Sequence, residues 1–482
     1  MLVAILLLSL PVQAQGGLRP RGDVNCDWEV NIADVDVLTD AILADEPYHS
    51  LYTYAHDVNG DKEINIADLN MLIGAIMGDE LAPMPTYSST LPVLFINTEE
   101  YQNIVSKEEY IRAEWWLDNM GIDSVQSIGS ESNPQKMQIK GRGNSTWEQY
   151  DKKPYRLKLA VKQPLVGMPA NRHWVLLANA HYWKGIINDV LPWEIGRRMG
   201  MAWNPRFEPV EVVLNGEYIG MYFLTEKIRV DKHRVNITEQ QDGETDMDKI
   251  TGGWLLEIDN YAEPNRITID NGYGDNMWIT PHSPEELSSE QRDYITDFLV
   301  KTTEAILIDD VTDRTWEQYI DIDALAIYYI VQEITDNIEA FAGSCFMYKE
   351  RGDSTKLIFG PLWDGGSVYH RWTEDYLFNE FIYENVPSYS HLKWIKDIVK
   401  FEHFQERVRY HWKHFYEEVY PGMDDFLDQF AATIEKAGNY DSKVWTRLSA
   451  DHISQRMEQY GKPCFHKKVA WLQSQWGADN EE

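Results

Sequence analysis

Two twelve-residue stretches near the start of the chain carry oxygen-bearing side chains at the same spacing. They read DVNCDWEVNIAD at 23–34 and DVNGDKEINIAD at 57–68. Asp or Asn fills loop positions one, three, five, nine and twelve, and position seven is a Glu that would ligate through its backbone carbonyl. Calcium takes about six to eight oxygen ligands, and this spacing folds one loop around one ion. The predicted ligands are Asp23, Asn25, Asp27, Glu29, Asn31 and Asp34, and Asp57, Asn59, Asp61, Glu63, Asn65 and Asp68.

Each predicted loop runs into an amphipathic helix and departs from a standard EF-hand at two positions. Position twelve is Asp rather than Glu, and position six is Trp28 or Lys62 rather than Gly. Duplicated loops of this kind, each followed by one helix, resemble dockerin modules. The resemblance implies bound Ca²⁺ and docking onto a cohesin-type module or another cell-surface protein. The alternatives are a calcium-bound stalk with no cohesin partner, and two acidic turns without metal.

A lone aspartate ends an apolar run in the second half of the chain. The stretch KLIFGPLWDGG (356–366) places Asp364 directly after a predicted buried strand, where a carboxylate is well placed to hold a metal ion. The two residues that follow, Gly365 and Gly366, supply no second ligand. The stretch is therefore either a working metal site or the remains of one.

A glycine-rich turn and a basic strand occur in the first half. IKGRGNSTW (139–147) combines two glycines with the Ser145 hydroxyl, and glycine lets backbone N–H groups approach an anion. On the strand that follows, Arg156 and Lys158 point to one face. The two segments would neutralise phosphates, or would form a tight hairpin and a solvated strand face. The basic residues of the second segment are Lys152, Lys153, Arg156 and Lys158.

The elements that must position these residues divide the chain into a sheet-rich and a helical part. Six strand-like runs lie in the first half: LPVLFIN, KMQIKGRG, YRLKLAV, WVLLAN, VEVVLNGEYIGMYFLTEKI and GGWLLEID. Apolar residues at three- and four-residue spacing predict helices in four later segments: SEQRDYITDFLVKTTEAIL, DIDALAIYYIVQEIT, KDIVKFEHFQERVRYHWKHFYEEVY and HKKVAWLQSQW. This order indicates an α+β fold with a cleft between two lobes. The predicted domains are a signal peptide at 1–14, calcium-binding repeats at 23–80, a linker at 81–90 and one large domain at 91–475.

The composition of the chain limits where the protein is expected to be located and which partners it can bind. The sequence has 482 residues and a formal net charge of −34, which disfavours nucleic acid because like charges repel. The apolar run at 1–14 ends in Val-Gln-Ala and predicts a signal peptide, and thus a secreted or cell-surface protein. No stretch is long enough for a transmembrane span. Three scattered cysteines give neither a disulfide framework nor metal-ligand spacing.

The motifs of residues 91–475, taken together, resemble the CotH-type spore-coat protein kinases. The resemblance implies an atypical two-lobed kinase-like fold, Mg²⁺ and ATP as cofactors, and phosphoryl transfer to serine on a protein substrate. Such chemistry needs phosphate clamps, magnesium ligands and a residue that orients the hydroxyl. The motifs that carry the resemblance are LPVLFIN, GRGNSTW, KKPYRLKL, WVLLAN, VEVVLNGEYIGMYFLTEKI, GGWLLEID, VQEITDNIEAF, SCFMYKE, IFGPLWD and KKVAWL.

The resemblance also implies roles for individual residues. Asp364 corresponds to the magnesium-binding aspartate, and Glu339 stands where the family usually places a catalytic Asp. Lys158 would contact phosphate, with Glu226 as its partner. The residues expected to line the phosphate turn are Arg142, Asn144 and Ser145.

Several positions depart from the family pattern. The second acid of the Trp-Asp-Phe-Asp motif is Gly366 here, and Glu339 is one methylene longer than Asp, with Asp336 as a possible substitute. Further departures are Ser344 for an expected Asn, Ile187 for an Arg, Tyr182 for an acid and Thr280 for a Lys.

These departures leave three functions open. The first is an exported, active protein serine kinase with a calcium-binding module. The second is a catalytically degenerate kinase-like domain that serves as an extracellular binding or scaffold protein, anchored through its calcium module. The third is carbohydrate binding or hydrolysis, which draws on the dockerin resemblance and the 18 Trp, although paired carboxylates are unspecific in a chain with 78 acidic residues.

Overall fold

The computed structural model describes residues 18–44, 53–61, 63–179, 186–370, 378–384, 393–445 and 452–477. The predicted signal peptide at 1–14, Lys62 and Tyr182 lie outside these residues. Contacts divide the chain into two compact units. Unit 1 consists of residues 1–183, 207–226 and 431–453, and unit 2 of residues 184–206, 227–430 and 454–482. The described chain is mixed α+β, with a sheet-rich N-terminal and a helical C-terminal region, which confirms the α+β part of the prediction.

In unit 1, strands β1 to β7 close into a barrel in the order β1-β2-β3-β4-β5-β7-β6. Neighbouring strands are antiparallel except β1 and β6, whose parallel pairing closes the barrel. In β4, Leu157 and Leu159 face the buried core while Arg156 and Lys158 face outward, which is the two-residue period of a strand. The strands are β1 (Val93–Thr98), β2 (Ile111–Asp118), β3 (Gln135–Gly141), β4 (Tyr155–Leu165), β5 (Met168–Leu177), β6 (Phe207–Leu214) and β7 (Glu217–Glu226).

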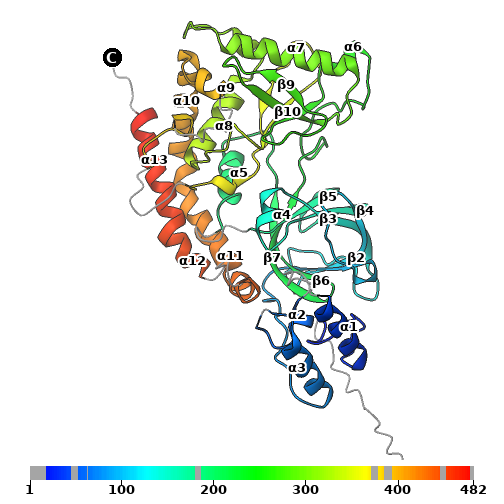
Figure 1. Cartoon of the computed structure of the whole chain (residues 1–482). Coiled ribbons are helices and arrows are strands. Elements are labelled where there is room, and N and C mark those ends of the chain that lie inside the picture. The colour runs from blue at the N-terminus through cyan, green and yellow to red at the C-terminus, as the bar shows by residue number, and fades with distance from the viewer. Residues whose placement is uncertain are drawn as a thin grey trace, which may run out of the picture. The chain divides into compact units, whose positions relative to one another are not determined.

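The two acidic repeats form a small helical module in unit 1. Helices α1 (Ile32–Leu43) and α3 (Ile66–Ile76) follow the two loops, and α2 (Thr53–His56) lies between them. In both long helices an Asn caps the first turn and an Asp at the third helical position completes a capping box. Leu38 and Leu72 are fully buried where the helices pack together. The module lies beside the β6 and β7 end of the barrel (Figure 1).

Unit 2 contains a sheet with strand order β12-β11-β8-β10-β9 and most of the long helices. Helix α7 lies beside β9 and β10 (Figure 1). Tyr328 of α8 packs edge-on against Phe359 of β12, with the ring centroids 5.8 Å apart. The strands are β8 (Trp254–Ile258), β9 (Ile267–Asp270), β10 (Asn276–Ser283), β11 (Cys345–Lys349) and β12 (Ile358–Phe359).

The other helices range from four residues in α6 and α12 to 22 residues in α11. Helix α11 begins in unit 2 and ends in unit 1. Within the described residues, no helix has both the length and the apolar character needed to cross a bilayer. The helices are α4 (Ser145–Gln149), α5 (Val190–Arg198), α6 (Met247–Ile250), α7 (Ser289–Ile306), α8 (Ile322–Ile334), α9 (Lys393–Ile398), α10 (Glu402–His414), α11 (Met423–Val444), α12 (Ile453–Arg456) and α13 (Lys462–Trp476).

Candidate functional site

Asp364 occupies a sharp turn that follows β12 in unit 2. Its backbone adopts the left-handed conformation, with φ 58° and ψ 73°, which is uncommon for a residue with a side chain. The carboxylate accepts a hydrogen bond of 3.2 Å from the Gly366 N–H and is otherwise exposed. An acid held at a tight turn with a solvent-facing oxygen is suited to coordinate a cation.

Gly365 is required by the backbone that packs against it. A Cβ at this position would lie 2.0 Å from the carbonyl oxygen of Asn188, which is closer than any real contact. The Gly365 N–H donates to Asp189 Oδ1 over 2.8 Å. Asn188 and Asp189, which precede α5, therefore pack directly against the turn. This packing explains why a glycine follows Asp364.

Asn188 presents a buried oxygen at the same turn. Its Nδ2 donates to the carbonyl oxygens of Gly365 at 2.9 Å and Gly366 at 3.4 Å, and these two acceptors fix the orientation of the amide. The residue is 8 % exposed, and its Oδ1 has no hydrogen-bond partner among the described residues. A buried acceptor without a partner costs stability, and a bound ion or water molecule at Oδ1 would remove that cost.

Glu339 reaches the same turn from the segment after α8. Its Oε2 accepts a hydrogen bond of 2.6 Å from the Ser367 hydroxyl. The two predicted catalytic residues, Glu339 and Asp364, are thus brought to one turn. Asp336 is fully buried instead and forms an ion pair of 3.3 Å with Lys468. This burial argues against Asp336 as a substitute for Glu339.

The predicted phosphate turn lies in unit 1, between β3 and β4. The Arg142 N–H donates to the Pro154 carbonyl, Asn144 Oδ1 accepts from Lys107 over 3.3 Å, and Ser145 is exposed at the start of α4. A Cβ on Gly141 would lie 2.4 Å from the Trp147 ring. Packing against this ring is sufficient to explain the first glycine.

The predicted pairing of Lys158 with Glu226 is wrong. Lys158 lies opposite His173 on the outer face of the barrel wall, with its Nζ 5.9 Å from the Tyr110 ring centroid. Glu226 lies opposite the core residue Trp174 and is fully buried. Because directly paired residues share a face, the two side chains point to opposite sides of the wall.

Lys152 was expected in the basic row but belongs to the core of unit 1. Its Nζ contacts Asp441 at 2.6 Å and the Met221 carbonyl at 2.5 Å, and both charged side chains are fully buried. Burial lowers the pKa of Lys152, against the raising effect of Asp441. Sequence reasoning missed this pair because Asp441 is 289 residues away.

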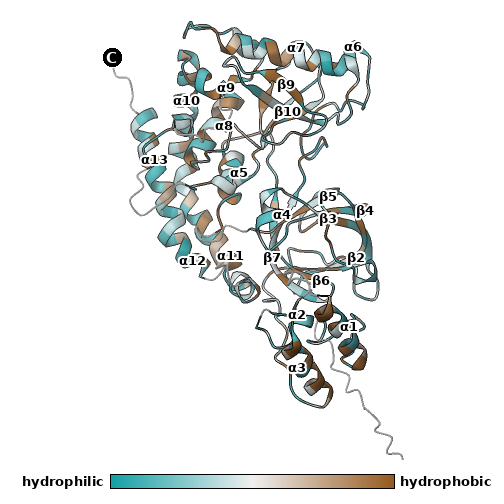
Figure 2. Cartoon of the chain, in the orientation of Figure 1, coloured by the Kyte–Doolittle hydropathy of each residue, from teal (hydrophilic) through white to brown (hydrophobic). Residues whose placement is uncertain are grey.

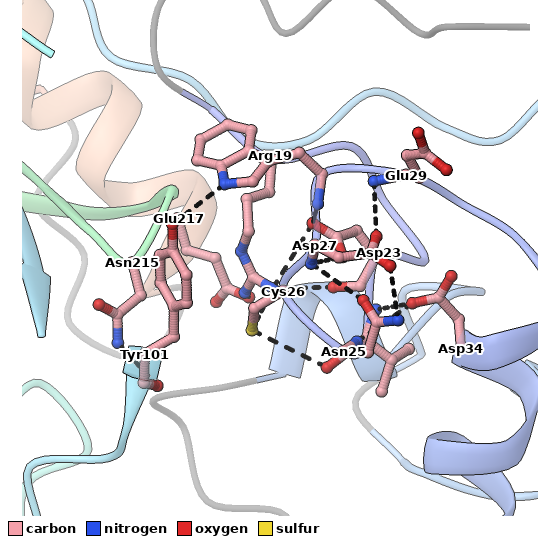
Figure 3. A network of polar contacts seen from close by, with 12 residues as sticks. Arg19, Asp23, Asn25, Cys26, Asp27, Glu29, Asp34, Tyr101, Asn215 and Glu217 are labelled. Atoms are coloured by element: carbon pink, nitrogen blue, oxygen red, sulfur yellow. Dashed lines mark hydrogen bonds and ion pairs between the residues drawn. The ribbon is translucent and has the colours of Figure 1, made fainter. Parts of the chain in front are cut away.

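The two acidic loops have matching geometry. In the first, Asp34 Oδ1 accepts from the Asn25 N–H at 3.1 Å (Figure 3), while its Oδ2 accepts from the Asn31 N–H at 2.8 Å. Asp68 repeats both roles, with bonds of 3.1 Å to the Asn59 N–H and 2.9 Å to the Asn65 N–H. The short Asp at position twelve therefore joins the start of each loop to its helix cap.

The side-chain oxygens inside each loop also hold backbone N–H groups. Asn25 Oδ1 binds the Asp27 N–H at 2.9 Å, and Asp27 Oδ1 binds the Glu29 N–H at 2.9 Å. Asn59, Asp61 and Glu63 repeat this ladder in the second loop. Within the described residues, no three His, Cys, Asp or Glu side chains gather as a metal group by themselves. Any oxygen shell here must include amide and carbonyl oxygens.

Asp23, at position one, is fully buried in the first loop. Burial raises its pKa to about 6, although the Arg19 guanidinium opposes the shift. The Asp23 carboxylate accepts hydrogen bonds of 3.1 Å from the N–H groups of Asp27 and Trp28. Trp28 adopts φ 70°, which a glycine would take without strain, so the loop keeps its turn despite the large side chain.

Comparison with known protein families assigns most of the chain. Residues 139–473 match the family model described as CotH kinase protein. The chain belongs to the CotH kinase protein family. Residues 21–77 match the model described as Dockerin type I domain, so both resemblances seen in the sequence are confirmed in the expected order. None of the curated proteins compared with the chain matches it.

Proposed function

We propose that this CotH family chain is an ATP- and Mg²⁺-dependent protein serine kinase that carries a calcium-binding dockerin module. The observation that carries the kinase proposal is the turn at residues 364–367. It presents the exposed Asp364 carboxylate, and it is contacted by the Glu339 carboxylate and by the Asn188 amide, whose oxygen has no partner among the described residues. Phosphoryl transfer depends mainly on positioned charge of this kind. The two-lobed kinase-like arrangement is part of the proposal.

The residues of the turn fit a magnesium ion. Asp364 offers a carboxylate oxygen, and Asn188 offers the Oδ1 atom that lacks a partner among the described residues. Magnesium prefers oxygen ligands and keeps several waters, so one or two protein ligands are enough. When bound, Mg²⁺ would neutralise charge on the phosphates of ATP. Asn188 would thereby supply an oxygen in place of the missing second acid at Gly366.

Glu339 would orient the serine hydroxyl of the substrate. In the structure its carboxylate already accepts a hydrogen bond from a hydroxyl, that of Ser367, at 2.6 Å. A carboxylate in this position holds an attacking hydroxyl and takes its proton as the phosphoryl group transfers. The substrate serine would replace Ser367 as the donor.

The remaining nucleotide contacts are proposed from the phosphate turn and the adjoining strands. Arg142, Asn144 and Ser145 would approach the phosphates, and Lys158 would add positive charge. Glu226 remains a proposed cofactor-binding residue, without a role as partner of Lys158. Support for this region comes from the family match, which begins at residue 139.

The dockerin module would bind two Ca²⁺ ions and dock onto a cohesin-type module or another cell-surface protein. The loops supply hard oxygen ligands at the required spacing. The module also exposes apolar side chains at equivalent positions of its two repeats, seen as brown helices in Figure 2. Ile32 and Ile66 are 63 % and 62 % exposed, and Leu43 and Met77 are 78 % and 81 % exposed. We therefore propose a secreted or cell-surface location.

A second candidate function is calcium-dependent binding without catalysis. The observation in its favour is the turn itself, in which Gly366 offers no second acid and Asn188 contributes a neutral ligand. In this case the CotH domain would be a recognition surface, and the dockerin module would anchor it.

Calorimetric titration of Mg·ATP into the calcium-loaded protein tests the proposal. We expect binding that needs Mg²⁺ and weakens at least tenfold in Asp364→Ala. Asp353→Ala removes an exposed carboxylate from the loop before β12 and should bind ATP normally. Glu339→Gln should keep ATP affinity and lose phosphoryl transfer to serine peptides. No binding by the wild-type protein would favour the non-catalytic function.

A further inference from the structure

Lys468 of α13 lies between two acids at the C-terminal end of α8. Its Nζ is 3.2 Å from Glu333 Oε2 and 3.3 Å from Asp336 Oδ1, and all three side chains are fully buried. The same Nζ donates to the Glu380 carbonyl over 2.6 Å. One buried ammonium group therefore joins α13, the end of α8 and the segment at 378–384.

The cluster holds one acid more than charge balance requires. Burial raises the pKa of Glu333 to about 7, although Lys468 opposes the shift. The Glu333 carboxylate also accepts the Ile382 N–H, over 3.0 and 3.1 Å to its two oxygens. Replacing buried ionic clusters by apolar side chains is often neutral or stabilising. Stability alone therefore does not explain the second acid, Asp336, and its place in the chain suggests another role.

Asp336 begins the turn that carries Glu339. Its backbone is left-handed, with φ 47°, and so reverses the chain after α8. The Glu339 N–H donates to Asn337 Oδ1 over 3.4 Å, and Asn337 Nδ2 donates to Gln332 Oε1 over 3.1 Å. The residues between Asp336 and Glu339 are thus held against the last turn of α8.

Two hydrogen bonds join this turn to the candidate site. The Ser367 hydroxyl donates to Glu339 Oε2 over 2.6 Å, and the Tyr369 N–H donates to the Thr335 carbonyl over 3.1 Å. Thr335 directly precedes Asp336 in the chain. An ion pair that fixes Asp336 therefore also fixes how Glu339 meets the turn of the candidate site.

We propose that Lys468, acting through Asp336, is a positioning residue that holds the Glu339 carboxylate in place for the substrate hydroxyl. The inference rests on the proposed kinase function. Without the ammonium group, the Glu333 and Asp336 carboxylates repel each other in a medium of low dielectric, and the turn moves away from α8. A misplacement of about 1 Å costs on the order of a hundredfold in rate.

Steady-state phosphorylation of a serine peptide by the full chain tests the role of Lys468. Lys468→Met should lower kcat about 10- to 100-fold, while Mg·ATP affinity, measured by calorimetry, stays within about twofold because Asp364 is untouched. Lys462→Met is the matched control. Lys462 lies on the same helix and also pairs with two acids, Asp428 and Glu458. Its loss should leave kcat unchanged, and equal losses of kcat in the two variants would overturn the proposal.

A second variant tests whether the effect passes through Asp336. Asp336→Gly removes the carboxylate, and glycine adopts φ 47° without strain. This variant should lower kcat as Lys468→Met does, and it also serves where Lys468→Met does not fold. The double variant should be no slower than the slower single variant. Losses of kcat that multiply in the double variant would show that Lys468 does not act through Asp336, and would overturn the proposal.

Hydrogen exchange of the full chain separates this inference from the kinase proposal. The Tyr369 N–H is protected by its bond to Thr335, so peptides covering 364–370 should exchange about fivefold faster in Lys468→Met. Peptides covering 267–283, in the sheet of unit 2, should not change. An equal rise in both regions, or no rise at 364–370, would overturn the positioning role. A wild-type protein that transfers no phosphate would overturn the kinase proposal, and with it the role of Lys468 in catalysis, even if exchange showed that Lys468 holds the turn.

Discussion

Gly365 is the residue on which the geometry of the candidate site depends. Its α-carbon lies against the Asn188 carbonyl, so the glycine brings the turn close enough for Asn188 to hold two of its carbonyls. This contact also fixes the Asn188 amide, whose Nδ2 faces the turn and whose buried Oδ1 has no hydrogen-bond partner among the described residues. Gly365, one of the two glycines that supply no second ligand after Asp364, is therefore required by packing. In the proposed site, the replacement for the acid missing at Gly366 would come from another segment, through Asn188.

Gly365→Ala should destabilise unit 2 and disturb the turn. The added methyl would meet backbone atoms at 2.0 Å, which a flexible side chain could avoid but a packed backbone cannot. We expect a loss of about 2–4 kcal/mol in the free energy of unfolding, measured by urea titration. Gly274→Ala is the control, since its site has φ +83° but open space, and strain alone costs about 1 kcal/mol. Equal losses of unfolding free energy in the two variants would contradict the close packing of Gly365 against the Asn188 backbone.

Asp259, at the end of β8, should make stability depend on pH. Burial raises its pKa to about 6 from an ordinary 3.8, with a further contribution from the Glu257 carboxylate and an opposing one from His282. Ionising Asp259 therefore costs the folded protein stability as the pH rises from about 4 to 6. Thr280, expected as lysine in the family, lies 3.5 Å from this carboxylate and brings no charge to offset the cost.

Asp259→Asn should accordingly be more stable than the wild type at pH 7.5, by about 1–2 kcal/mol after allowance for partial exposure. The difference should vanish near pH 4, where the wild-type carboxyl is protonated. Thermal unfolding at both pH values measures it. Asp118→Asn, at an exposed site, should show no such difference. A variant that is less stable at pH 7.5 would mean that Asp259 gains more from its surroundings than burial costs.

At the scale of elements, local patterns were predicted well and long-range pairings were not. The loops and helices α1 and α3 follow from residues within twelve positions of one another, and α7, α8 and α13 show clear helical periodicity. The barrel closes because β1 pairs in parallel with β6, more than one hundred residues later, and no local spacing encodes that register. Strand β2 and helix α11 were not predicted.

The candidate site divides in the same way. Asp364 and Glu339 carry recognisable motifs, so both could be named from the sequence. Asn188 could not, because its importance comes from a buried oxygen that only the packed turn reveals. Lys152 was assigned to a basic row by its spacing, and its true partner comes from α11.

The pair of Lys152 and Asp441 should hold α11 to the barrel of unit 1. Asp441 Oδ1 also accepts from the Met221 N–H at 2.7 Å, so the carboxylate ties the helix to β7. Removing one partner strands a buried charge, and we expect Lys152→Met to lose about 3–5 kcal/mol in urea unfolding. The double variant Lys152→Met/Asp441→Leu should recover a large part of the loss. Additive losses would show that the two charges do not depend on each other.

At the scale of the whole molecule, charge links calcium to stability. The chain carries a net charge of −34, and each calcium loop adds four carboxylates within twelve residues. Self-repulsion destabilises a compact acidic chain, and bound cations or salt relieve it. Bound calcium and added salt both reduce the repulsion between carboxylates, so each should stabilise the protein less when the other is present.

Salt should therefore stabilise the calcium-free protein more than the calcium-loaded protein. Raising KCl from about 0.05 to 0.5 M shortens the screening length from roughly 14 to 4 Å. The repulsion between neighbouring carboxylates of a loop then becomes weaker. We expect the melting temperature in EGTA to rise by about 3–6 °C, and by less than half of that in Ca²⁺. The variant Asp27→Asn/Asp61→Asn, with less charge in both loops, should respond weakly to salt in EGTA. If salt raises the melting temperature equally with and without calcium, the dominant charge repulsion lies outside the two loops.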